Sequence, residues 1–364
     1  MIIGDFNPMK NGQNHPMLTI LNICMAVLLV PSVFFGVLSG NGETAEASEN
    51  QKLSIVTTIF PEYDWVRETM GDEADRAEIT MLLDSGVDLH NYQPTVDDII
   101  KISNCDLFIY VGGESDGWVE DALAGAANKN MTVINLLEVL GDAAREEELV
   151  EGMEDGHYED EHGEGDHGEG DAEEKDHEDE EAAEEAEYDE HVWLSLKNAS
   201  VFCRCIADTL GSLDAERKDS YEANAAAYIE KLDELDQAYQ DAADATSVKT
   251  LLFGDRFPFR YLVDDYGLDY FAAFTGCSAE TEASFETIVF LAGKADELGL
   301  SAIMQVEGSD GSIARTVRDN TASKDQAILT LDSMQGTTFE DVEAGATYLS
   351  VMESNLDVLR KALE

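Results

Sequence analysis

Apolar residues along this chain alternate between short β-branched runs and longer stretches with helical spacing. The short runs at residues 53–58, 77–83, 106–111 and 131–136 predict four strands, and those at 248–253, 270–274, 302–306 and 327–331 predict four more. Helices are predicted between them, at residues 63–70, 96–102, 118–127, 285–298, 312–319 and 339–363. This alternation favours an α/β fold of two similar lobes, each a mostly parallel four-stranded sheet flanked by helices.

A long helical segment, residues 215–247, separates the two series of strands. It contains neither Pro nor Gly up to residue 245, and large apolar positions recur on one face: Tyr221, Tyr228, Leu232, Leu235 and Tyr239. A helix of about 30 residues would extend roughly 45 Å, which is enough to join two lobes. A rigid helical link would also permit less hinge closure than a loop.

The sequence therefore divides into six parts. We expect a signal or anchor segment with a linker (1–51), an N-terminal lobe (52–145), an acidic histidine-rich loop (146–190), the remainder of the N-terminal lobe (191–214), an interlobe helix (215–247) and a C-terminal lobe (248–364). Within the first part, residues 17–40 are apolar and uncharged, as in a secretory signal or a single membrane anchor. Cys24 lies inside this stretch rather than just after it, which is a poor lipidation signal. We expect an exported protein of the cell envelope, in the periplasm or at the outer face of the cytoplasmic membrane, with its anchoring left open.

The net charge limits the classes of partner that the chain can bind. A formal net charge of −56 argues against nucleic acid, because the phosphate backbone would be repelled, and it favours cations. We also expect a monomer, since no segment indicates an obligate oligomer. The cysteines after residue 50 form no CxxC pair, so buried or free thiols are expected, with one disulfide left open: Cys105, Cys203, Cys205 and Cys277.

An acidic run between Glu146 and Glu190 concentrates the histidines. Five of the seven histidines lie in it or at its edge, namely His157, His162, His167, His177 and His191. Imidazole and carboxylate together suit a borderline cation such as Zn²⁺. Like charges and the lack of apolar residues predict disorder without metal. We expect the loop to collect cations weakly or to sense high zinc; the alternative is a spacer.

Polar residues follow several predicted strands at the carboxyl edge of each sheet, where open α/β sheets bind ligands. His90 follows the second strand, and His191 follows the acidic run. Asp255 follows the fifth strand, Glu307 ends the seventh, and Asp332 ends the eighth. Nitrogen and oxygen ligands drawn from two facing lobes predict a metal site between them.

Several motifs then resemble one known family. They are residues 57–63 (TTIFPEY), 88–94 (DLHNYQP), 110–113 (YVGG), 191–199 (HVWLSLKNA) and 331–333 (LDS). Together they resemble the zinc/manganese substrate-binding proteins of bacterial ABC importers, the ZnuA/TroA-like family (cluster A-I, solute-binding protein family 9), over about residues 52–363. The resemblance implies two lobes bridged by one long helix, and one metal ion bound between them and passed to a membrane permease.

The resemblance also implies a ligand set. Two histidine ligands match His90 and His191, and an aspartate matches Asp332. The third ligand position, usually histidine or glutamate, falls on Arg256, which cannot ligate a cation. Asp255 or Glu307 would then take its place, which leaves open the third ligand and the choice of metal.

We therefore expect an exported receptor that captures Zn²⁺ and delivers it to an ABC importer permease, rather than an enzyme. Two neutral imidazoles favour zinc, whereas added carboxylates would favour Mn²⁺, so a manganese receptor is the near alternative. A surface metal buffer or adhesin without a transport role is another. A metallohydrolase is disfavoured because no HExxH motif and no carboxylate dyad with histidine spacing occurs.

Overall fold

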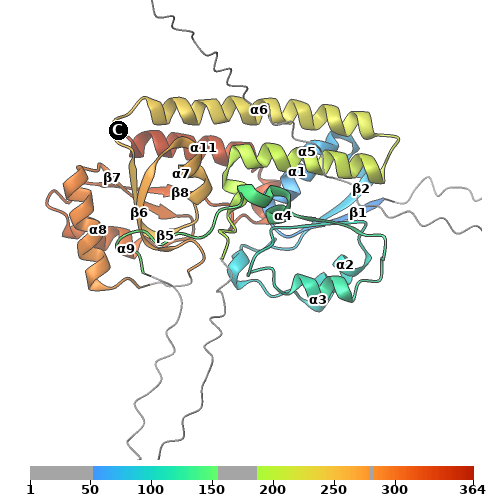
Figure 1. The fold of residues 1–364 in the computed structure, drawn as a ribbon, viewed down its shortest axis with the longest axis horizontal. Coiled ribbons are helices and arrows are strands. Elements are labelled where there is room, and N and C mark those ends of the chain that lie inside the picture. Colours follow the sequence, from blue (N-terminus) through green and yellow to red (C-terminus); the bar gives the residue numbers. More distant parts are fainter. Residues whose placement is uncertain (1–51, 155–186, 279–281) are drawn as a thin grey trace, which may run out of the picture. The chain divides into compact units, whose positions relative to one another are not determined.

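Two parallel sheets of four strands organise the molecule (Figure 1). The computed structural model describes residues 52–154, 187–278 and 282–364. The N-terminal sheet has the order β2-β1-β3-β4 and the C-terminal sheet the order β6-β5-β7-β8. Each lobe therefore repeats the same topology, and the predicted fold of two similar lobes with parallel sheets is confirmed.

The strands lie close to where the β-branched runs place them. They are β1 (Leu53–Thr57), β2 (Ala77–Met81), β3 (Leu107–Tyr110), β4 (Thr132–Asn135), β5 (Thr250–Phe257), β6 (Asp269–Thr275), β7 (Ala302–Val306) and β8 (Ala327–Leu331). The central strands β3, β5 and β7 are largely buried, as expected for parallel sheets covered by helices. In such sheets the loops that follow the carboxyl ends of the strands carry the ligand-binding residues, and the polar candidate site residues lie in such loops.

Helices connect these strands and cover the sheets. In the N-terminal half they are α1 (Phe60–Met70), α2 (Val96–Asn104), α3 (Val119–Ala124), α4 (Leu136–Leu140) and α5 (Leu196–Leu213). In the C-terminal half they are α7 (Arg260–Tyr266), α8 (Phe285–Leu298), α9 (Ser312–Asn320), α10 (Phe339–Glu343) and α11 (Tyr348–Ala362). None of the helices within the described ranges is both long enough and apolar enough to cross a bilayer. The predicted signal or anchor segment lies outside those ranges.

The long helix α6 (Lys218–Asp244) joins the two lobes. Its 27 residues extend roughly 40 Å, and the five apolar residues predicted to share one face are all buried. It packs along α5 and α1 of the N-terminal lobe and against α11 and α7 of the C-terminal lobe (Figure 1).

The prediction of a single helix over residues 339–363 is wrong. The chain forms α10 and α11 instead, separated by Gly345 with a φ of 104°. That left-handed backbone favours glycine, and Thr347 then caps α11 by accepting a hydrogen bond from the Ser350 amide.

Helix α11 also connects the lobes. The Tyr348 hydroxyl donates to the carbonyl oxygen of Trp193 at 2.7 Å, and the Tyr348 amide donates to Asp64 Oδ2 at 2.9 Å. The Tyr348 ring packs edge-on against Trp65, with 5.2 Å between the ring centroids. A single hydrophobic core cluster consequently contains residues of both lobes.

Candidate metal centre

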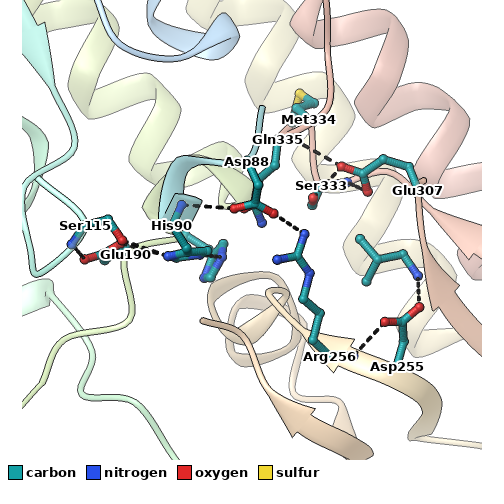
Figure 2. Close-up of polar contacts among 12 residues, drawn as sticks. Asp88, His90, Ser115, Glu190, Asp255, Arg256, Glu307, Ser333, Met334 and Gln335 are labelled. Atoms are coloured by element: carbon teal, nitrogen blue, oxygen red, sulfur yellow. Dashed lines mark hydrogen bonds and ion pairs between the residues drawn. The ribbon is translucent and has the colours of Figure 1, made fainter. Parts of the chain in front are cut away.

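His90 lies in a short 3₁₀ turn, Leu89–Asn91, that follows β2. The Asp88 carboxylate begins this turn by accepting a hydrogen bond from the His90 amide at 3.0 Å. Nδ1 of His90 lies 2.8 Å from Ser115 Oγ and 3.4 Å from Glu190 Oε2. These contacts fix the ring on its Nδ1 side (Figure 2) and leave Nε2 facing the ring of His191.

His191 lies at the start of the 3₁₀ turn Val192–Leu194, and its side chain is fully buried. One oxygen of Asp189, Oδ1, accepts from the His191 amide at 2.8 Å and lies 2.9 Å from Nδ1. Because a carboxylate can only accept, this contact assigns the proton to Nδ1 and a lone pair to Nε2.

The two histidines meet through their Nε2 atoms, which lie 3.1 Å apart. The acidic side chains on the Nδ1 sides, Asp189 and Glu190, favour the tautomer with a lone pair on each Nε2. At this separation the two nitrogens can share a proton in a hydrogen bond, whose direction depends on the tautomers, or hold a cation between them. The structure therefore brings together the two histidines that the sequence singled out.

Cys277, for which the sequence predicted only a buried or free thiol or one partner of a disulfide, completes this group. Cys277 follows the carboxyl end of β6, and its Sγ and one ring nitrogen each of His90 and His191 lie within 4.8 Å of one another. Its position after a strand was the only sequence signal available, and it is shared by many buried cysteines. Burial, together with Glu147, Glu190 and Asp189, raises the pKa of the Cys277 thiol well above its usual value.

Arg256, at the position where the resemblance implies a ligand, forms an ion pair with Asp88 across the lobes (Figure 2). Burial alone would raise the pKa of Asp88, but Arg256 and His90 outweigh it and hold the pKa below its usual value. The Gln335 amide turns its NH₂ toward Asp88, at 2.7 and 3.1 Å from the two oxygens. Its oxygen then lies 3.1 Å from Nε2 of His191 and accepts a hydrogen bond from it when that nitrogen carries a proton.

The three predicted carboxylate ligands have other hydrogen-bond partners. Glu307 accepts from the Ser333 amide at 2.7 Å and from the Ser333 hydroxyl at 2.6 Å, and so holds the loop after β8 (Figure 2). Asp332 accepts from the Met334 amide, and Asp255 accepts from the amides of Arg256 and Val306. None of the three belongs to the group formed by the two histidines and Cys277 within the described residues.

The carboxylates beside the two histidines differ in pKa from those farther away. Burial would raise the pKa of Glu190, but the nearby His90 ring and the hydrogen bond from the Ser115 amide outweigh it and hold the pKa below its usual value. Burial, and then the neighbouring Asp332, raises the pKa of Glu307 to about 7. Glu190 is thus anionic beside the imidazoles, whereas Glu307 is partly protonated near neutral pH.

Two cavities adjoin the centre. One of about 650 Å³ is lined by Asp88, Asp255, Arg256 and Glu307, among others. The other, of about 390 Å³, is lined by residues from both ends of the acidic run and by residues outside it, namely Ser115, Glu147, Glu187, Tyr188, Glu190 and Cys277 among others. Cations can therefore reach Cys277 through a cavity with carboxylate walls.

Two lobes of the same strand order, joined by a long helix and enclosing a polar centre, are the architecture of two-lobed solute-binding proteins. The model of one such family, described as zinc-uptake complex component A, periplasmic (ZnuA), matches residues 55–362. The chain belongs to this family.

Individual relatives agree with this assignment. The chain is 31% identical over 319 residues to a zinc-binding lipoprotein, AdcA, of Streptococcus pneumoniae, covering 86% of this chain but 56% of that protein. It therefore spans about half the length of these first relatives. It is 28% identical over 326 residues to the high-affinity zinc uptake system protein ZnuA of Bacillus subtilis, covering 89% of this chain and 92% of that one.

Solved structures show the same fold. The Zn(II)-bound ZnuA-like domain of Streptococcus pneumoniae AdcA has a TM-score of 0.63 at 28% identity, covering 86% of this chain and 99% of that chain. The periplasmic zinc-binding protein TroA of Treponema pallidum has a TM-score of 0.64 at 21% identity, with 86% of this chain and 99% of that chain covered. This second likeness concerns the fold alone.

Proposed function

We propose that this chain is the receptor of a metal importer, which captures Zn²⁺ between its lobes and delivers it to an ABC importer permease. The observation that carries the proposal is the approach of the two Nε2 atoms to 3.1 Å, with acidic side chains on both Nδ1 sides. Metal-bound histidines usually have such a carboxylate on the second ring nitrogen. The zinc-binding relatives support zinc as the cargo.

His90 and His191 are the proposed ligands, and they favour Zn²⁺ over harder cations. Asp255, Glu307 and Asp332 stay predicted ligands that would have to exchange their present hydrogen bonds for the metal. If they do, oxygen ligands would dominate and Mn²⁺ would become the preferred cargo. We propose a binding role rather than a catalytic one, for a protein that acts as an exported monomer.

The histidine-rich loop is proposed to supply cations to this centre. His157, His162, His167 and His177 lie outside the described residues, but both flanks of the loop are described. Glu154 pairs with Phe274 of β6 in a parallel bridge, and Tyr188 pairs with Glu146. Glu187 and Tyr188 line the same cavity as Cys277, so metal released from the loop would arrive beside the centre.

Competitive calorimetry tests the proposal. The chain and its His90→Ala/His191→Ala double variant are titrated with Zn²⁺ and with Mn²⁺ in separate and competing runs. One tight zinc site that the double variant loses supports a zinc receptor. A site that prefers Mn²⁺ would indicate a manganese receptor. Zinc binding that survives in the double variant would assign the metal to the acidic loop and favour a buffer.

A further inference from the structure

Cys277 reaches the histidine pair because the residue before it is glycine. A Cβ on Gly276 would lie 2.9 Å from Cε1 of His191 and equally close to the Phe257 carbonyl oxygen, so any side chain there would have to displace the ring. The absence of a side chain lets the loop after β6 pass directly against the imidazole. The chain is thus locally built to bring the thiol to His191.

The spacing of the three groups suits a tetrahedral metal. Bonds of about 2.0–2.1 Å to nitrogen and about 2.3 Å to sulfur place two nitrogens about 3.3 Å apart and a nitrogen and a sulfur about 3.6 Å apart. The Nε2 atoms are 3.1 Å apart, and the three ligand atoms lie within 4.8 Å of one another. Small side-chain rotations would bring all three to bonding distance.

Cys277 is also the residue that the C-terminal lobe contributes to this group. His90 and His191 both come from the N-terminal lobe, and a site between lobes needs a ligand from the other side. Asp255, Glu307 and Asp332 hold loop amides, and Arg256 is paired with Asp88. Cys277 is therefore the described C-lobe side chain whose ligand atom already lies with both imidazoles.

We propose that Cys277 is the third zinc ligand, through a thiolate that forms on binding. The inference rests on the proposed function, since it concerns the same bound ion. Zinc displaces the thiol proton, which passes to solvent water or buffer, while the sulfur lone pair forms the Zn–S bond and no redox change occurs. A thiolate is a soft ligand, so it also discriminates against Mn²⁺ at this centre.

Cobalt substitution tests the ligand directly, because Co²⁺ bound to a thiolate has a near-ultraviolet charge-transfer absorption that nitrogen and oxygen ligands lack. The metal-free full chain is reduced and titrated with Co²⁺ without oxygen. Cys277→Ser is compared with Cys205→Ser, a control at another partly exposed cysteine. A second measurement needs no variant: alkylation of each cysteine in the wild-type chain is mapped by mass spectrometry with and without Zn²⁺.

We expect the charge-transfer band in the wild type and in Cys205→Ser and its loss in Cys277→Ser, together with zinc protection of Cys277 but not of Cys205. Stoichiometric cobalt binding without the band, and alkylation of Cys277 that zinc leaves unchanged, would overturn the thiolate and leave the zinc receptor intact. No metal binding at all by the wild-type chain would overturn both the ligand and the receptor.

Discussion

Replacing Asp189 by asparagine removes the negative charge that orients His191 without changing the size of the side chain. A single oxygen of Asp189 accepts both the backbone amide and Nδ1 of His191, at 2.8 and 2.9 Å, and the carboxylate is almost fully buried. In the variant, the amide is free to turn its NH₂ toward Nδ1, which would move the imidazole proton to Nε2 and block the metal. Losing such a partner typically weakens metal binding by about 10–100-fold, or about 1.4–2.7 kcal/mol.

The distances around the two histidines predict which of two variants weakens zinc binding more. Glu190 lies 3.4 Å from Nδ1 of His90, and Ser115 Oγ shares that contact at 2.8 Å, so Glu190→Gln should weaken binding less than Asp189→Asn. Competition against a zinc chelator measures both dissociation constants, and melting curves check that each variant folds. Asp269→Asn, a loss of the same charge at the exposed start of β6, serves as the control. An unchanged zinc affinity in Asp189→Asn would refute the tautomer argument.

Two further predictions concern Glu62 and the acidic histidine-rich loop. Burial, and then Asp116, raises the pKa of Glu62 from 4.5 to about 8. Its contribution to folding is therefore complete below about pH 4.5 and is lost as the pH rises through 8. Urea unfolding of metal-free protein should show this decline in the wild type and a flatter profile in Glu62→Gln, and parallel profiles would contradict the buried acid. Replacing residues 157–185 by a short Gly-Ser linker keeps Glu154 and Tyr188, which anchor the flanks. Calorimetry should then show fewer weak zinc sites and an unchanged tight site; a lost tight site would place it in the loop.

Much of the fold was predictable because its signals are local. Runs of β-branched residues and a long helical stretch without Gly or Pro are patterns of residues that are close together in the sequence. They are enough to predict the strands of both lobes and the helix between them. The division between α10 and α11 was missed because the apolar pattern continues across it, whereas the left-handed φ of Gly345 becomes visible only in the structure.

The site was predictable only in part. His90 lies in the loop after the second strand, so its place at the carboxyl edge of the sheet could be inferred from topology, and His191 stood out because it ends the acidic run. Cys277 could not be placed in the same way, because its position depends on a close approach between Gly276 and the His191 ring that no sequence pattern encodes. Similarly, nothing in the residues around Glu307 indicated that its carboxylate would bind the amide and hydroxyl of Ser333.

The docking of α11 on the N-terminal lobe has a consequence for the order in which the chain folds. Tyr348 follows Asp64 by 284 residues, yet its amide supplies a hydrogen bond to that buried carboxylate and its ring covers Trp65. The lobe that is synthesised first thus stays incomplete until α11 has been synthesised, and contacts of such sequence separation form late. Until then its apolar surface is exposed, so the unfinished chain should depend on folding helpers far more than the folded protein does.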